Sequence, residues 1–490
     1  MPLFWNRKTL FRILIILLWL VLFGALLQRD FFVKKLDLRE ARIIKQARET
    51  EFLGIHFQNQ RIGYVKTRLN RIANGRGFTL VEDAILRLNI LGEIHPIRMH
   101  LEAGLTERLL LQHFNFQLIS PFYQIDAQGL VSGSRIGLTI RTGKETIRDT
   151  VQLASQPFLP TNQRGYLLGP DLKTGDKLRI PYFDPLSLTG KDTVIEYRGI
   201  DKVQVEGRIH TLHHFTETFA GVRISTWLDN TGKVIKEESP AGFVFISEPE
   251  FKAIDIVAKG EELLRRVAVP LTGSMPELTG MKQMRYILTL PEGVEYSLDK
   301  DRQRLTGNLL TVTLENPADF DADPCQGREA ELAATPYIQA KNRRIAELAA
   351  TVTRDAGSAL AKVRRLAAWV YDNLEKRPVL GIPDALTTLQ TRRGDCNEHA
   401  ALFAALARSI GIPTRVAAGV TLHLGAFYYH AWNEVCLGDN WLSLDTTRNQ
   451  LPADLTHIKF VEGGVNDMAK IGSLINNLQI SAAADTGGAQ

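Results

Sequence analysis

The strongest constraint on the fold is a change of hydrophobic period along the chain. From about Glu51 to residue 245, apolar and polar residues alternate, as in "KVQVEGRIHTL", a period typical of strands with one buried face. From Thr335 onward, apolar residues instead recur at helical spacing, as in "LAKVRRLAAWVYDNL". We therefore expect an antiparallel β-rich part, followed by a part that mixes helices with strands.

The chain has 490 residues, which is long enough for several domains, and we predict an α+β multidomain fold. Alternation in "MRYILTLPEGVEYSL" and "LLTVTLENP" predicts a second, small β domain between the two parts. The predicted organisation is a transmembrane anchor at 1–30, a helical stalk at 31–50, a large antiparallel β-rich domain at 51–245, a helical connector at 246–270, a small β domain at 271–330, an α+β domain at 331–475 and a disordered tail at 476–490.

The N-terminus predicts a membrane anchor. The run "ILIILLWLVLFGALL", Ile13 to Leu27, carries no charge, and Leu10 and Phe11 lengthen it toward the roughly 30 Å of a bilayer core. No A-x-A cleavage site and no lipid-accepting cysteine follow the run, so we expect an uncleaved single-pass anchor rather than a signal peptide. Basic residues precede it, which places the chain after Gln28 outside the cytoplasm, on the periplasmic side of an inner membrane.

Composition excludes some classes of partner and ligand. The net charge of +5 is spread along the chain without a long basic run, so we expect no nucleic-acid partner. The three cysteines, Cys325, Cys396 and Cys436, form neither a disulfide framework nor a zinc motif. Cys325 and Cys436 could pair outside the cytoplasm, but we favour a buried thiol at Cys436. No cofactor is expected, and the oligomeric state stays open.

One cysteine lies at the start of a predicted helix, in "RRGDCNEHAALFAALARSIGIP". Asp395 is a suitable N-cap, and Glu398 three residues later completes a capping-box pattern. Cys396 then occupies the first helical position, among free backbone N–H groups at the positive end of the helix dipole. This position favours a thiolate over a thiol. The alternative is a small residue that is merely tolerated at a helix start.

A predicted hairpin follows in "FYYHAWNEVCLGDNWLSLDTT", with its turn at Gly438–Asp439. If Leu437 pairs with Asn440, then His430 and Asp445 become diagonal neighbours on one face, within side-chain reach. A carboxylate beside an imidazole fixes its tautomer and stabilises its charged form. Such an imidazole can in turn activate a cysteine as a nucleophile.

The order "GDC…HAW…D", with "RRGDCNEHAALFAALARSIGIPTRVAAG", "HAWNEV" and "WLSLDTT" around it, resembles the transglutaminase-like superfamily. The core of that family is similar to that of papain-like enzymes, and the resemblance covers about residues 335–460. It implies that Cys396 is the nucleophile, His430 its base and Asp445 the residue that orients the histidine. The layout is similar to bacterial, membrane-anchored, extracytoplasmic members.

The resemblance implies a thiol enzyme that attacks an amide carbonyl of a protein or peptide and forms a thioester. Water would resolve the thioester in a cysteine protease or amidase, and a lysine amine would do so in a transglutaminase. We favour hydrolysis, because water is always present and no crosslinking target is evident outside the cytoplasm. The alternative from another class is a non-catalytic binding or assembly module, since the β-rich region is the larger part.

Other polar and aromatic residues near these motifs have weaker claims to a role. Gln390 lies six residues before Cys396, the spacing of an oxyanion donor in papain-like proteases, but an exposed helical glutamine is favoured. The backbone N–H of Cys396 is the expected oxyanion donor. His399 and His423 have no ligand partners at a useful spacing, so we expect no zinc. Trp432 shares the face of His430 and could border the site or belong to the core.

Overall fold

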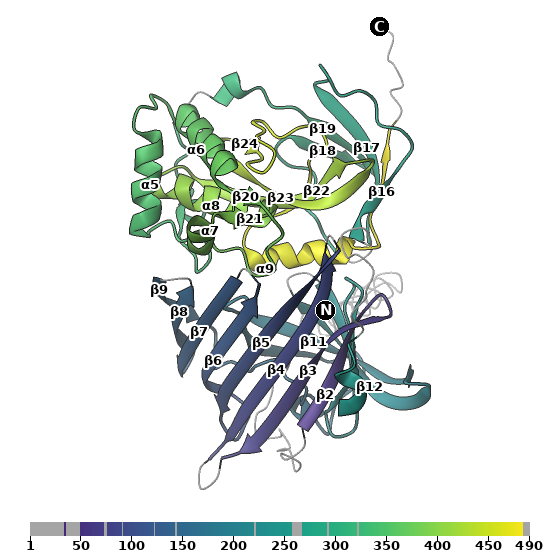
Figure 1. Cartoon of the computed structure of the whole chain (residues 1–490). Helices are drawn as coiled ribbons and strands as arrows, with labels where there is room; N and C mark the ends of the chain where they lie inside the picture. The colour runs from purple at the N-terminus through teal and green to yellow at the C-terminus, as the bar shows by residue number, and fades with distance from the viewer. Residues whose placement is uncertain are drawn as a thin grey trace, which may run out of the picture.

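The computed structural model describes residues 34–35, 50–72, 76–90, 92–121, 123–142, 145–219, 222–256, 267–291, 294–320 and 323–483. Among the described residues, strands account for 50% and helices for 17%. In Figure 1 the strands of the first half form the lower part of the molecule, and the helices and strands of the second half lie above them.

A 15-stranded sheet contains the described strands of the first half. Its strand order is β1-β10-β11-β12-β13-β14-β15-β2-β3-β4-β5-β6-β7-β8-β9, so β2 and β15 pair although they lie far apart in sequence. The strands are β1 (Lys34–Lys35), β2 (Thr50–Phe57), β3 (Gln60–Arg71), β4 (Phe78–Ile90), β5 (Glu93–Leu105), β6 (Leu111–Ser120), β7 (Tyr123–Ser132), β8 (Arg135–Thr142), β9 (Glu145–Gln152), β10 (Lys177–Asp184), β11 (Thr189–Val205), β12 (Arg208–Phe219), β13 (Val222–Leu228), β14 (Val234–Glu238) and β15 (Phe243–Ser247), with a 3-10 helix η1 at Gly165–Leu167.

A 9-stranded sheet and a group of helices form the second half. The strand order of this sheet is β18-β19-β17-β26-β16-β23-β22-β25, and β24 pairs with β23. The strands are β16 (Val269–Thr272), β17 (Gln283–Thr289), β18 (Gln303–Thr306), β19 (Leu309–Thr313), β22 (Thr414–His423), β23 (Ala426–Leu437), β24 (Asn440–Leu444), β25 (Ile458–Glu462) and β26 (Gln479–Ala482); β20 (Glu375–Lys376) and β21 (Arg393–Gly394) form a separate pair. The helices of this half are α4 (Glu329–Leu332), α5 (Arg343–Thr353), α6 (Ala359–Asn373), α7 (Ala385–Thr391), α8 (Cys396–Ser409), α9 (Val465–Met468), η2 (Pro317–Phe320) and η3 (Ala469–Leu474), whereas α2 (Glu250–Ala253) contacts β2 of the large sheet.

The predicted α+β multidomain fold class is wrong, because the chain is mainly β and its expected small β domain at 271–330 is not separate. Strand β16 pairs with β23, and β26 pairs with both β16 and β17. The strands of the expected small domain therefore continue the sheet that carries the predicted hairpin. Hydrophobic alternation predicts that a segment is a strand, but it does not predict which distant strand will pair with it.

The ends of the chain also differ from the prediction. Lys34–Lys35 form a strand parallel to β10 where a helical stalk was expected at 31–50, and residues 36–49 lie outside the described part. Strand β26 lies within the predicted tail at 476–490. No helix among the described residues is long and apolar enough to cross a membrane. The expected transmembrane anchor at 1–30 lies outside the described residues.

The two halves share buried contacts. The hydroxyl groups of Thr142 in β8 and Thr387 in α7 lie 2.5 Å apart, and the Tyr337 hydroxyl donates to the Leu186 carbonyl over 2.9 Å. Tyr337 and Ile382 belong to the same apolar cluster as the inner side chains of β3–β8. The large sheet therefore packs directly against the helical side of the second half.

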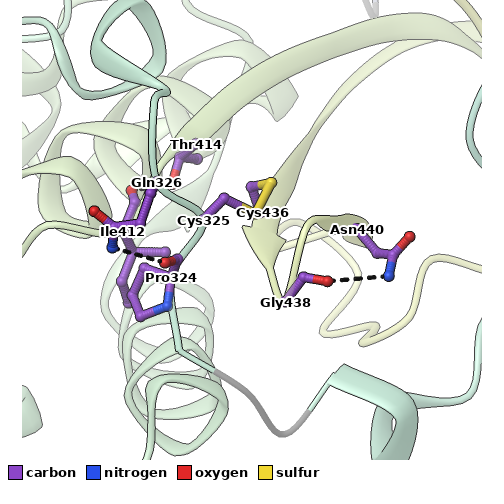
Figure 2. The surroundings of a disulfide bond; sticks show 8 residues. All are labelled: Pro324, Cys325, Gln326, Ile412, Thr414, Cys436, Gly438 and Asn440. Atoms are coloured by element: carbon purple, nitrogen blue, oxygen red, sulfur yellow. Dashed lines mark hydrogen bonds between the residues drawn. A yellow bond between two sulfur atoms is a disulfide. The ribbon is translucent and has the colours of Figure 1, made fainter.

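A disulfide joins Cys325 to Cys436 in β23, across 111 residues of sequence (Figure 2). The backbone of Cys325 also donates to the Cys436 carbonyl over 3.2 Å, so the segment before α4 lies along the end of β23. Our expectation of a buried free thiol at Cys436 is wrong. Cys396 is then the one free cysteine of the three in the sequence.

The disulfide predicts the thiol count of the purified protein. When the protein is unfolded in denaturant without reductant, a thiol titration should detect one free thiol per chain. After reduction, the titration should detect three. Because the bond closes a long loop, the Cys325→Ser/Cys436→Ser pair should lower the free energy of unfolding by about 2–5 kcal/mol. Cys396→Ser serves as the matched control and should leave that free energy nearly unchanged. Three titratable thiols before reduction would contradict the bond.

Candidate active site

The helix that starts at Cys396 has the predicted cap. The Asp395 side chain accepts from the Asn397 backbone over 2.9 Å, and Glu398 accepts from the Asp395 backbone over 2.9 Å. Both halves of the capping box are therefore present. The cap fixes the start of α8, and with it the position of the thiol.

The Cys396 thiol is partly buried against strand β23. Burial raises the pKa of this thiol well above its ordinary value, and the carboxylates of Asp395 and Glu398 raise it further. The Ala431 backbone N–H lowers the pKa of the thiol, but it does not outweigh the other effects. The expected resting thiolate is therefore not favoured. The helix dipole acts here against burial and against the two acids of the cap.

The hairpin that carries the predicted histidine and aspartate has the predicted register. Leu437 pairs with Asn440, and the ladder continues to Asn433 opposite Leu444. His430 lies in β23, directly before Ala431, whose backbone N–H lowers the pKa of the Cys396 thiol, and Asp445 follows β24 directly. The His430 Nε2 atom lies 2.8 Å from Asp445 Oδ2, which is a hydrogen bond of ordinary length.

The Asp445 carboxylate is completely buried and accepts several hydrogen bonds. Its Oδ1 atom accepts from the backbones of Thr447 and Arg448, over 2.7 and 3.2 Å. Its Oδ2 atom accepts from His430 over 2.8 Å and from His457 over 3.1 Å. Burial alone would raise the pKa of Asp445, but the bonds from the two imidazoles outweigh burial and hold the pKa well below its usual range. Asp445 is therefore ionised.

His430 is arranged to act as a base. Because its Nε2 atom donates to an ionised carboxylate, the neutral ring carries its free lone pair on Nδ1. Burial lowers the pKa of His430, and the hydrogen bond that His430 donates to Asp445 offsets this only in part. The ring is therefore neutral near pH 7 and able to accept a proton.

His457 is the residue of this cluster that the sequence analysis missed. It lies directly before β25, and in the sheet β22 and β23 separate β25 from β24, the strand that Asp445 follows. The sequence offers one local signal, the acid three residues earlier: His457 Nδ1 lies 2.9 Å from Asp454 Oδ1. That spacing alone does not indicate a link to Asp445.

The remaining residues considered from the sequence occupy different surroundings. Trp432 is buried. Its ring is stacked against the His430 ring, with the ring centroids 6.3 Å apart, and is edge-on to the His457 ring, with the centroids 5.1 Å apart. It therefore both borders the site and belongs to the core. Gln390 is exposed on α7, and His423 is exposed at the end of β22. His399 is buried, with Nδ1 2.7 Å from the Asp395 carbonyl and Nε2 without a hydrogen-bond partner among the described residues.

Two groups of side chains in the described part of the chain have the geometry to hold a metal ion. The first is His430, Asp445 and His457, whose ligand atoms lie within 4.8 Å of one another. A cation there would have to replace the protons that both imidazoles donate to Asp445. The second group consists of the acids Asp301, Glu434 and Glu462, which are already paired with Arg415 and Lys459.

The buried carboxylate predicts a pH-dependent loss of stability in Asp445→Asn. The substitution leaves His457 with one of its two acidic partners, and losing a buried charged partner costs about 3 kcal/mol or more near neutral pH. Because the pKa of Asp445 is lowered in the folded protein, its ionised form contributes stability at pH values above the unfolded-state pKa of about 4. This contribution is lost as the pH falls toward the folded-state pKa. Urea unfolding at several pH values should therefore show the variant and wild type converging in acid. A difference that is constant with pH would contradict this account.

Comparison with known proteins identifies the domain that carries this cluster. Residues 346–446 match the family model of the transglutaminase-like superfamily core, so the chain contains a transglutaminase-like core domain. The matched range includes Cys396, His430 and Asp445, and it ends before His457. No curated protein matches the sequence.

Three solved structures are similar to parts of the chain. One from Cytophaga hutchinsonii, provisionally described as a cysteine protease, is 19% identical, with TM-score 0.28, over 41% of this chain and 84% of its own. A β-barrel-like protein of unknown function from Brucella abortus is 12% identical, with TM-score 0.32, over 41% and 96%. A provisionally described protease from Parabacteroides distasonis is 12% identical, with TM-score 0.19, over 69% of each chain. At these scores none of the three supports a structural argument.

Proposed function

Starting from the transglutaminase-like core at residues 346–446, we propose that this protein is a cysteine-dependent hydrolase of amide bonds in proteins or peptides. Cys396 is the nucleophile, His430 the general base and acid, and Asp445 the residue that orients His430. The observation that supports this assignment most is the 2.8 Å hydrogen bond from His430 to a buried, ionised Asp445. His430 is also the neighbour of Ala431, whose backbone N–H lowers the pKa of the Cys396 thiol.

The reaction begins with both partners neutral. His430 Nδ1 takes the thiol proton as the Cys396 sulfur attacks the amide carbonyl, so the unfavourable free thiolate does not have to form in advance. The imidazolium then gives that proton to the departing amine, and a thioester remains. His430 next removes a proton from water, the hydroxide attacks the thioester, and the returned proton restores the thiol.

Two features of the site stabilise the charges that develop. The ionised Asp445 stabilises the His430 imidazolium, because it accepts the hydrogen bond from Nε2. The Cys396 backbone N–H, at the first turn of α8, is the proposed donor to the oxyanion. Aminolysis of the thioester by a lysine instead of water would make the same residues a transglutaminase, and the products distinguish the two outcomes.

The disulfide supports a location outside the cytoplasm. Disulfides persist in oxidising compartments and are rare in the reducing cytosol. The bond between Cys325 and Cys436 links the segment before α4 to the strand of His430, so the stability of the site would depend on such a compartment. We propose an extracytoplasmic enzyme on this ground.

Substitution of the nucleophile tests the activity directly. Purified protein incubated with a peptide library and cadaverine should produce new peptide N-termini, and Cys396→Ala should abolish them. The same comparison in cells, by N-terminal peptide profiling of the extracytoplasmic fraction, should reveal the natural substrates. Cadaverine-labelled glutamines without new N-termini would indicate a transglutaminase. If folded protein yields no new N-termini, no cadaverine-labelled glutamines and no glutamines hydrolysed to glutamate, the non-catalytic module is the remaining account of this domain.

The lowered pKa of His430 predicts the pH dependence of the hydrolysis. His430 must be neutral to act as the base. Because burial lowers its pKa, the neutral ring persists at pH values below the ordinary histidine pKa of about 6.5. The acid limb of kcat/KM should therefore have its midpoint below pH 6.5, measured on one cleaved library peptide. A midpoint well above 6.5 would show that Asp445 outweighs burial.

A further inference from the structure

We infer that His457 is a positioning residue of this site. As a charged imidazolium between two acids, His457 holds Asp445 in the orientation in which it accepts the hydrogen bond from His430. His457 is a second imidazole on the carboxylate that orients the first. The inference rests on the proposed function, because it treats His430 as the base. It extends that function to a residue outside the matched family range of 346–446.

The hydrogen bonds of His457 require both ring nitrogens to carry protons. Nε2 lies 3.1 Å from Asp445 Oδ2, and Nδ1 lies 2.9 Å from Asp454 Oδ1. Ionised carboxylates only accept hydrogen bonds, so each ring nitrogen has to donate. A ring that donates from both nitrogens is an imidazolium. Burial lowers the pKa of His457, but the bonds to the two acids outweigh burial and raise it above its ordinary value.

The position of His457 suits a supporting role and not a chemical one. Its side chain is completely buried, and both nitrogens are occupied by acids. It therefore has no free atom for a substrate. Its effect on the reaction passes through Asp445, whose Oδ2 atom it shares with His430. With the Thr447 and Arg448 backbones on Oδ1, this fourth bond leaves the carboxylate little freedom to rotate.

The backbone brings His457 to this place by a close approach of two strands. Strand β25 pairs with β22, with a register shift between Ala418 and Gly419. A Cβ atom at Gly419 would lie 1.9 Å from the carbonyl oxygen of Ile458, so this position excludes larger residues. On its other side Gly419 pairs with His430. Because Gly419 has no side chain, β25 can approach β22 closely, and His457, directly before β25, can reach the Asp445 carboxylate.

The charge of His457 also acts on the proton affinity of His430. The two rings lie 5.6 Å apart, and a positive charge at this distance disfavours a second one. The other charged or titratable groups that face the cluster are Arg448, 3.8 Å from Asp445, Asp454, His399 and the Cys396 thiol. His457 therefore offsets part of the negative charge of Asp445, which keeps His430 neutral and basic at lower pH.

Two substitutions separate the hydrogen bond from the charge. His457→Gln keeps an N–H donor near the position of Nε2 and removes the charge, whereas His457→Leu removes both. The readout is the rate at which iodoacetamide alkylates Cys396, measured from pH 4 to 9 by mass spectrometry, because this requires no substrate. His423→Gln, at an exposed histidine of β22, is the matched control.

The two variants should differ in a defined way. Loss of the charge should move the acid midpoint of the alkylation profile up by about one pH unit in both variants. Loss of the donor should lower the plateau rate about 10-fold in His457→Leu alone. The control should match wild type in both respects. If His457→Leu does not fold, the midpoint of His457→Gln alone decides the proposal.

Unchanged midpoints in folded variants would overturn the proposal, since a merely structural histidine would affect stability without moving the pH profile. The result is independent of the substrate. If the profile shifts while no peptide is cleaved, the positioning role stands and the proposed hydrolysis fails. If peptides are cleaved and the profile stays fixed, the hydrolysis stands and the role of His457 fails.

Discussion

Asp445 carries a buried negative charge that is balanced by two imidazoles and two backbone N–H groups, and three strands are held in register around it. A buried charge is stable only when it is paired and hydrogen-bonded. Strand β23 supplies His430, the turn after β24 supplies the acid, and the segment before β25 supplies His457. The sheet thereby fixes both the orientation and the neutral state of the proposed base.

The thiol environment has a consequence for the mechanism. A helix start usually favours a thiolate, but here the cap residues Asp395 and Glu398 and the burial of the sulfur favour the thiol. In the proposed mechanism, the thiol proton therefore moves to His430 during the attack and not before it. The neutral imidazole that Asp445 orients suits proton transfer during the attack better than a preformed ion pair would. The disulfide at Cys436 holds the far end of the same strand.

Local signals in the sequence predicted the parts of the site that are close in the chain. The Asp395 cap and the Gly438–Asp439 turn each depend on a few neighbouring residues, and together they placed His430 beside Asp445. His457 was not predicted, because its contact depends on the pairing of β22 with β25 and on the close approach at Gly419.

The same limit explains the errors in the fold. Alternation correctly indicated strands such as β17 in "MRYILTLPEGVEYSL" and β19 in "LLTVTLENP", but it did not indicate that both strands join the distant sheet that carries the His430 hairpin. The segment "KVQVEGRIHTL" shows a smaller error of this kind, since positive φ at Glu206 and Gly207 turns one expected alternating run into the two strands β11 and β12.

The most direct test of the central claim is capture of the acyl-enzyme. The protein is mixed with peptide p-nitroanilides, quenched in acid and digested, and its peptides are weighed by mass spectrometry. The account predicts an acyl group on Cys396 that hydroxylamine removes; release of nitroaniline with Cys396 unmodified, or no acylation by any peptide tested, would contradict it.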